Sequence, residues 1–84
     1  METSEYPKAV AAEVRAEIAR ANLTHSAVAD AAGIARATFS RKVNGKTPFD
    51  VLELASIAAT VGIEPDKFLR PSPESIATAE AVAA

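Results

Sequence analysis

Three neighbouring residues, His25, Ser26 and Asp30, have the types found in a nucleophile, its base and the acid that orients the base. Ser26 follows His25 directly, and adjacent residues on a helix point about 100° apart, so this pair cannot share a proton. His25 is the only histidine and the chain has no cysteine, which also argues against a transition-metal site. We therefore expect no enzyme activity, no cofactor and no metal. We expect His25 to have no catalytic role.

The segment NGKT, residues 44–47, contains Gly, Lys and Thr in the order found at the end of a phosphate-binding loop. Such a loop also needs a glycine five residues before Gly45, a strand ahead of it and a helix directly after it. Ser40 stands at the glycine position, and no strand pattern precedes it. The sequence therefore argues against a nucleotide-binding loop.

A basic segment without carboxylates spans residues 31–49. It holds four basic residues and no acidic one, whereas the rest of the chain has five basic and eleven acidic residues, a net charge of −6. The four basic residues are Arg36, Arg41, Lys42 and Lys46. A positive region on a negative chain is typical of a surface that binds nucleic acid, although a window of this length can also lack acids by chance.

Helical geometry divides this segment into two faces. At about 100° per residue, Phe39 and Val43 share one face, which we expect to be buried. The other side is small, polar and basic, and it consists of Ala37, Ser40, Arg41 and Asn44. Arg36 lies beside this strip, at the exposed first turn. A strip of this kind fits the DNA major groove, which is about 12 Å wide and admits one helix, but Ser, Arg and Asn are also common on any exposed helix face.

Two short helices joined by a tight turn must position the strip. Thr24 is placed to cap the first helix, and Gly33 to end it in the left-handed conformation. The second helix runs from about Arg36 to Asn44 and is closed by Gly45. Because the linker between the two is only three residues long, the pattern predicts a helix-turn-helix.

Three further helices complete the expected fold. The apolar stripe of the first helix is Val10, Val14, Ile18 and Ala21. Asp50 and Glu53 form a capping box that opens another helix, and Gly62 ends it. The predicted buried stripe of that helix is Val51, Leu54, Ile57, Ala58 and Val61. A last short helix is predicted to turn Phe68 and Leu69 inward.

The chain of 84 residues is therefore predicted to be all-α, with one domain over residues 1–70. Residues 71–84 are rich in alanine and form either a tail or a sixth helix that packs or dimerises. No apolar run approaches the roughly 20 residues that span a bilayer, and the acidic N-terminus is unlike a signal peptide. We expect a cytoplasmic protein without a membrane partner.

The order and spacing of these features resemble the lambda-repressor and Cro type of helix-turn-helix domain, a family of small bacterial and phage DNA-binding proteins. The resemblance covers residues 23–69, with residues 10–21 as the family's first helix. It depends on Val28, Ala29, Gly33, Ile34, Phe39, Asn44-Gly45 and Val61-Gly62-Ile63. It implies a five-helix domain in which the helix from Arg36 is the recognition helix.

The resemblance and the helical phase together assign nine residues to DNA. The residues expected to read bases or lie against them are Arg36, Ala37, Ser40 and Arg41. The residues expected to contact phosphates are His25, Lys42, Asn44, Lys46 and Thr47. The sequence departs from the family at three positions, since His25 replaces a usual glutamine, Ala35 a Ser or Thr cap, and Lys42 an aliphatic residue.

The predicted function is sequence-specific binding of double-stranded DNA by a small Cro-like transcriptional regulator. We expect this DNA binding to associate the protein with the nucleoid. Repression would be steric, by a homodimer on two half-sites about 34 Å apart. One alternative is a protein-interaction module of the same fold, similar to an antitoxin or antirepressor. Another is an architectural or recombination accessory factor that bends DNA. No small-molecule substrate is expected.

Overall fold

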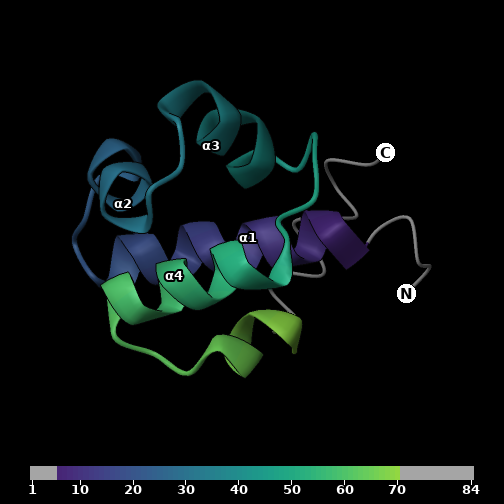
Figure 1. Cartoon of the computed structure of the whole chain (residues 1–84). Helices are drawn as coiled ribbons and strands as arrows, with labels where there is room; N and C mark the ends of the chain where they lie inside the picture. The colour runs from purple at the N-terminus through teal and green to yellow at the C-terminus, as the bar shows by residue number, and fades with distance from the viewer. Residues whose placement is uncertain (1–5, 71–84) are drawn as a thin grey trace.

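The computed structural model describes residues 6–70, and all regular secondary structure in this segment is helical. Four α-helices, α1 (Tyr6–Arg20), α2 (His25–Ala32), α3 (Arg36–Val43) and α4 (Val51–Val61), are followed by the 3-10 helix η2 (Pro65–Leu69). In Figure 1, α3 lies above α1 and α4, α2 lies at one end, and η2 lies below α4. The predicted all-α class is confirmed for this segment, whereas the predicted tail or sixth helix at 71–84 lies outside the described residues.

Local capping sets the helix boundaries where the sequence predicts them. The hydroxyl of Thr24 accepts the N–H of Ala27 at 3.0 Å at the start of α2, and Gly33 ends α2 at φ 73°. At the start of α4, the Asp50 carboxylate accepts the Glu53 N–H at 2.7 Å and the Glu53 carboxylate accepts the Asp50 N–H at 2.8 Å. These two reciprocal hydrogen bonds form the predicted capping box. The caps of α2 and α4 satisfy first-turn N–H groups that have no acceptor within the helix.

One hydrophobic core joins all five helices. Its members are Val10, Val14, Ile18, Val28, Ala29, Phe39, Val43, Leu54, Ile57, Ala58 and Phe68. Helix α2 packs against α3 and α4, α1 packs against α3 and η2, and α4 packs against η2. The core therefore fixes the position of α3 relative to the other helices. Only one side of α3 takes part in the core. Within residues 6–70, no helix is long and apolar enough to cross a membrane.

Two residues predicted to face inward lie at the surface. Val51 is 72% exposed and Leu69 is 47% exposed, so both predictions are wrong. A 3-10 helix has three residues per turn, which turns Leu69 about 120° away from the buried Phe68. Val51 belongs to the first turn of α4 and, with Tyr6 and Leu69, lines an open apolar groove of about 150 Å³.

Two carboxylates of α1 are buried beside its apolar stripe. Glu13 and Glu17 are only 2% and 4% exposed. Oε2 of Glu17 lies 2.9 Å from the Arg20 guanidinium and 2.6 Å from Nζ of Lys67, and Oε1 of Glu13 lies 3.5 Å from Arg20. Because Lys67 belongs to η2, this cluster ties η2 to α1 across the core.

Candidate nucleic-acid interface

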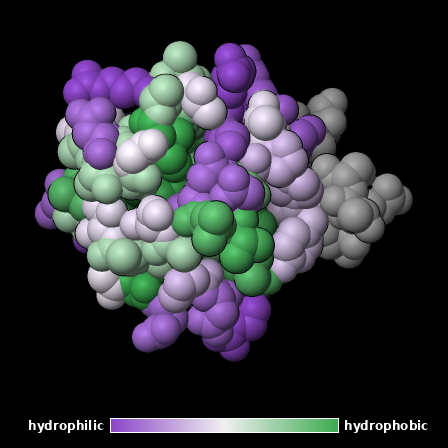
Figure 2. All heavy atoms as spheres, in the orientation of Figure 1, coloured by the Kyte–Doolittle hydropathy of each residue, from purple (hydrophilic) through white to green (hydrophobic). Residues whose placement is uncertain are grey.

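Helix α3 turns one face into the core and the other to solvent. Phe39 and Val43 are each 1% exposed, as their shared helical phase predicts. The other side is exposed along its whole length, at Ala37, Ser40, Arg41 and Asn44. Figure 2 shows hydrophilic residues at the top of the molecule, where α3 lies. The predicted division of α3 into a buried face and a polar strip is confirmed.

Helix α1 holds the C-terminal end of α3 in place. The Arg15 guanidinium donates a hydrogen bond of 2.5 Å to the carbonyl of Val43, the last residue of α3. A cation is favourable there, because the last carbonyls of a helix carry partial negative charge. Gly45 follows at φ 80°, and a Cβ atom on it would lie 3.3 Å from Cγ of Lys8. The loop after α3 therefore approaches α1 closely, at a position that favours glycine.

Lys42 has a carboxylate partner on another helix, which the sequence does not predict. Its Nζ lies 2.6 Å from both carboxylate oxygens of Glu53, and the two side chains are only 15% and 17% exposed. Glu53 also accepts the N–H of Asp50 in the capping box, so one carboxylate joins α3 to the start of α4. The ion pair of Lys42 and Glu53 links the two helices. This pairing gives the Lys42 ammonium a partner within the protein, and the assignment of Lys42 to DNA phosphate stays a prediction.

Arg36 is exposed at the first turn of α3, as predicted, but it has a partner. Its Nε donates to Oδ1 of Asp30 at 3.1 Å, and its Nη2 donates to Oδ2 at 2.6 Å. These hydrogen bonds hold the pKa of the Asp30 carboxyl below its ordinary value and raise the pKa of Arg36. The pair therefore stays charged at neutral pH and bridges the turn between α2 and α3.

Arg41 and Lys46 are the two cations of the basic segment that pair with no carboxylate among residues 6–70. Both are exposed, Arg41 in the middle of the polar strip and Lys46 in the loop after α3. Asn44 donates one of its two amide N–H groups to the Ser40 carbonyl at 2.8 Å, which leaves the other free to reach outward. Thr47 is exposed next to Lys46.

His25 lies at the first position of α2, exposed at one edge. Its ring meets Phe39 edge-on with centroids 6.0 Å apart, and Phe39 meets Phe49 in the same manner at 5.8 Å. This row of three rings joins the start of α2 to α3 and to the loop before α4. His25 therefore packs against the Phe39 side of α3 while remaining exposed itself.

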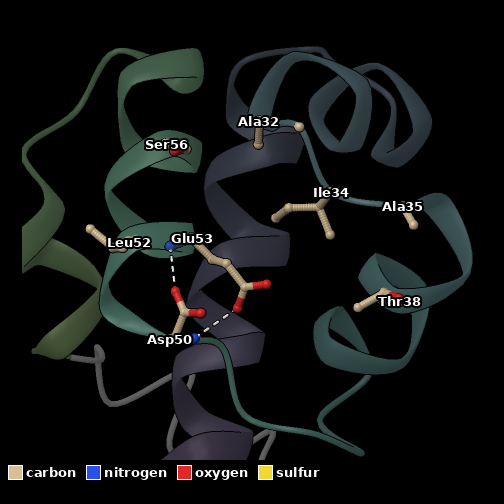
Figure 3. Close-up of a pocket in the computed structure, with 9 residues that line it drawn as sticks. Ala32, Ile34, Ala35, Thr38, Asp50, Leu52, Glu53 and Ser56 are labelled. Atoms are coloured by element: carbon tan, nitrogen blue, oxygen red, sulfur yellow. Dashed lines mark hydrogen bonds between the residues drawn. The ribbon is translucent and has the colours of Figure 1, made fainter.

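A hollow of about 350 Å³ lies between the turn after α2 and the start of α4 (Figure 3). Thr38, Ile34 and Ser56 contribute to its walls, and Asp50 and Glu53 are its two acids. Both acids already accept backbone N–H groups from each other, as the dashed lines in Figure 3 show. The hollow has no uncommitted charged group among its described residues, and no cluster of metal-ligating residues occurs in the segment 6–70.

Eight of the nine predicted residues are thus exposed, on α3, at the start of α2 and in the loop after α3, and the ninth, Lys42, is partly buried. Two contributors were missed, Asp30 and Arg15. Asp30 precedes Arg36 by six residues across a turn, and Arg15 acts on the carbonyl of a residue 28 positions later. Opposite charges on either side of the turn are the only signal in the sequence for the contact between Asp30 and Arg36. Nothing in the sequence indicates the contact between Arg15 and the Val43 carbonyl.

Comparisons of the chain with protein-family models, with curated proteins and with solved structures found no match. The interpretation of this surface therefore depends on its own geometry and charge. Those features are an exposed helix face of small side chains, two cations without carboxylate partners in the described segment, and a third cation held by Asp30.

Proposed function

We propose that the chain binds double-stranded DNA with sequence preference, as a small transcriptional regulator of the lambda-repressor and Cro type. Helix α3 would enter the major groove, and α2 would lie across the backbone. The observation that carries the proposal is the exposed face of α3, on which Arg41 lies among small side chains without a carboxylate partner in residues 6–70. Eight helical residues extend roughly 12 Å, enough to follow the groove for several base pairs.

The side chains differ in what they can recognise. Arg41 can donate two parallel hydrogen bonds to O6 and N7 of guanine, and the short side chains of Ala37 and Ser40 let the helix backbone come close to the bases. Lys46, Thr47 and the free N–H of Asn44 lie at the end of α3 and would contact phosphates, which fix the register of the protein on the duplex. His25 would do the same at the start of α2.

Charge supports the same orientation. The chain has a net charge of −2, and residues 31–49 hold four cations and no acid. Asp30 and Glu53 pair with two of these cations, and the other two, Arg41 and Lys46, make this segment the one that DNA approaches most readily. The longest dimension of the described part of the chain is 31 Å, which is shorter than the roughly 34 Å between half-sites on one face of the duplex. One copy would therefore cover one half-site, and a homodimer would cover a palindromic operator and block polymerase.

A second function, as a protein-interaction module, is favoured by one observation. Val51 and Leu52 at the start of α4 are 72% and 79% exposed, and Figure 2 shows hydrophobic surface on the face over α4. Exposed apolar side chains of this size commonly mark a protein contact. Under this second function, DNA binding would be weak and insensitive to salt, and a protein complex would be tight.

The test begins with selection of bound duplexes from a random library by the purified chain. Affinity for the selected duplex is then measured by fluorescence anisotropy for the wild type and for Arg41→Ala. We expect the variant to lose about 1–3 kcal/mol of binding free energy, because a bidentate base contact contributes about this much. Wild-type affinity should also fall steeply as salt increases, since neutralised phosphates release counterions.

Arg70→Ala is the matched control. Arg70 is an exposed arginine that follows η2 and pairs with Asp66 of that helix. Figure 1 shows η2 on the opposite side of the molecule from α3. Both variants remove one positive charge, so a difference between them reports position rather than net charge. Equal affinities of the two variants for the selected duplex would refute the assignment of α3 as the DNA-reading helix.

A further inference from the structure

The ion pair between Asp30 and Arg36 holds an arginine in a defined orientation at the exposed start of α3. Both side chains are more than half exposed, where solvent weakens the attraction between opposite charges. The contact is nevertheless two-pronged, with 3.1 Å from Nε to Oδ1 and 2.6 Å from Nη2 to Oδ2. A two-pronged contact fixes the plane of the guanidinium, which a single hydrogen bond does not.

The guanidinium group has five N–H donors arranged in a rigid plane, so it presents more than one edge to acceptors. Asp30 takes the edge formed by Nε and Nη2. The edge formed by Nη1 and Nη2 meets no acceptor among residues 6–70. This second edge carries two parallel N–H groups, the arrangement that pairs with O6 and N7 of guanine.

The location of the pair gives this free edge a use. Arg36 is the first residue of α3, on the same exposed surface as Ala37 and Ser40. Asp30 belongs to α2, which the core fixes against α3. A long arginine side chain would otherwise lose considerable rotamer freedom on binding a base, and a side chain that is already held loses less.

We propose that Asp30 is a positioning residue that holds the Arg36 guanidinium with its free edge directed at a guanine of the bound duplex. This inference rests on the proposed DNA-binding function and adds a residue that determines its specificity. The competing effect is repulsion, because an exposed carboxylate near phosphates weakens DNA binding in general. Positioning and repulsion predict opposite changes when the carboxylate is removed.

The experiment compares Asp30→Ala, Arg36→Ala and the wild type on the selected duplex and on copies in which one guanine at a time is replaced by 7-deazaguanine, which lacks the N7 acceptor. Asp66→Ala is the matched control, because it removes an exposed carboxylate paired with an arginine on the far side of the molecule. Thermal melting of each variant verifies that it is folded. At the guanine that Arg36 contacts, the wild type should prefer guanine over 7-deazaguanine by about 5- to 150-fold.

Arg36→Ala is expected to abolish this preference, and Asp30→Ala to remove most of it while Asp66→Ala retains it. If Asp30→Ala keeps the preference and binds all duplexes more tightly, as Asp66→Ala does, Asp30 acts by repulsion and the inference is wrong. If no guanine preference of the wild type depends on Arg36, the inference also fails, although DNA binding stands. A preference that Arg36→Ala retains and Arg41→Ala abolishes reports the separate contact of Arg41 and does not count toward the inference. If the wild type binds no duplex with preference, the proposed function itself fails.

Discussion

Replacing Lys42 by methionine tests the link between α3 and α4. Methionine retains an unbranched apolar side chain and removes the ammonium group, which lies 2.6 Å from both oxygens of Glu53. The variant leaves Glu53 mostly buried, at 17% side-chain exposure, with the Asp50 N–H as its remaining partner at 2.8 Å. The expected effect is a loss of stability without a loss of DNA contacts.

The structure bounds the size of this loss. Breaking a fully buried ion pair costs about 3–5 kcal/mol, whereas an exposed pair contributes about 0–1 kcal/mol. Lys42 and Glu53 are partly exposed, and Glu53 retains one hydrogen bond, so we expect a loss of about 1–2 kcal/mol. In a domain of this size, that loss lowers Tm by roughly 10 °C.

Urea denaturation of the wild type, Lys42→Met, Glu53→Gln and the double variant measures the interaction. Glutamine can still accept the Asp50 N–H, so Glu53→Gln removes the charge and keeps the cap. If the pair is coupled, the double variant should be more stable than the sum of the single losses predicts, by about 1 kcal/mol. Additivity within about 0.5 kcal/mol would refute the coupling of α3 to α4 through this pair.

Arg41→Met is the companion variant for Lys42→Met. Arg41 is the adjacent residue of α3, it is exposed and it has no carboxylate partner among residues 6–70. Arg41→Met should change stability by less than about 0.5 kcal/mol and weaken DNA binding. Lys42→Met should leave the slope of log affinity against log salt unchanged. A fall of about one in that slope would confirm Lys42 as a phosphate contact.

Three further predictions follow from single contacts. Phe39→Ala removes a ring that is 1% exposed and should cost about 3–5 kcal/mol, so circular dichroism should show a largely unfolded chain, and a wild-type-like melt would contradict its place in the core. Lys46→Ala should weaken binding to all duplexes equally and lower the salt slope by about one; a loss restricted to the selected duplex would contradict a phosphate contact. The pKa of Asp30, followed by carboxyl NMR, should lie below 3.8 and rise in Arg36→Ala. Because folding lowers the pKa of Asp30, the pair stabilises the fold at pH values above the ordinary carboxyl range. This small contribution is lost as the pH falls through the lowered pKa. An equal pKa of Asp30 in the wild type and in Arg36→Ala would exclude the pair in solution.

Helix boundaries and the phase of α3 could be predicted because their determinants are local. A cap is a contact between residues two or three positions apart, so Thr24, Asp50 and Glu53 indicate helix starts directly. The spacing of Phe39 and Val43 places both on one face whatever packs against it. The exposed strip on α3 is the complement of that face, and the sequence therefore predicts it as well.

Contacts between elements could not be predicted, because they depend on how the helices pack. Val51 continues the apolar stripe of α4 yet lies in an open groove, since stripe periodicity does not show how far the neighbouring helices extend. The partner of Lys42 is eleven residues away on another helix. Burial of Glu17 depends on Lys67, which only the fold brings to α1.

The most direct test of the central proposal is an NMR titration of the isotope-labelled chain with the selected duplex at physiological salt. If α3 lies in the major groove, the largest amide shifts should occur at Ala37, Ser40 and Arg41, with further shifts at the start of α2 and in the loop after α3. Shifts concentrated at Val51 and Leu52, or a spectrum that the duplex leaves unchanged, would contradict DNA binding through this surface.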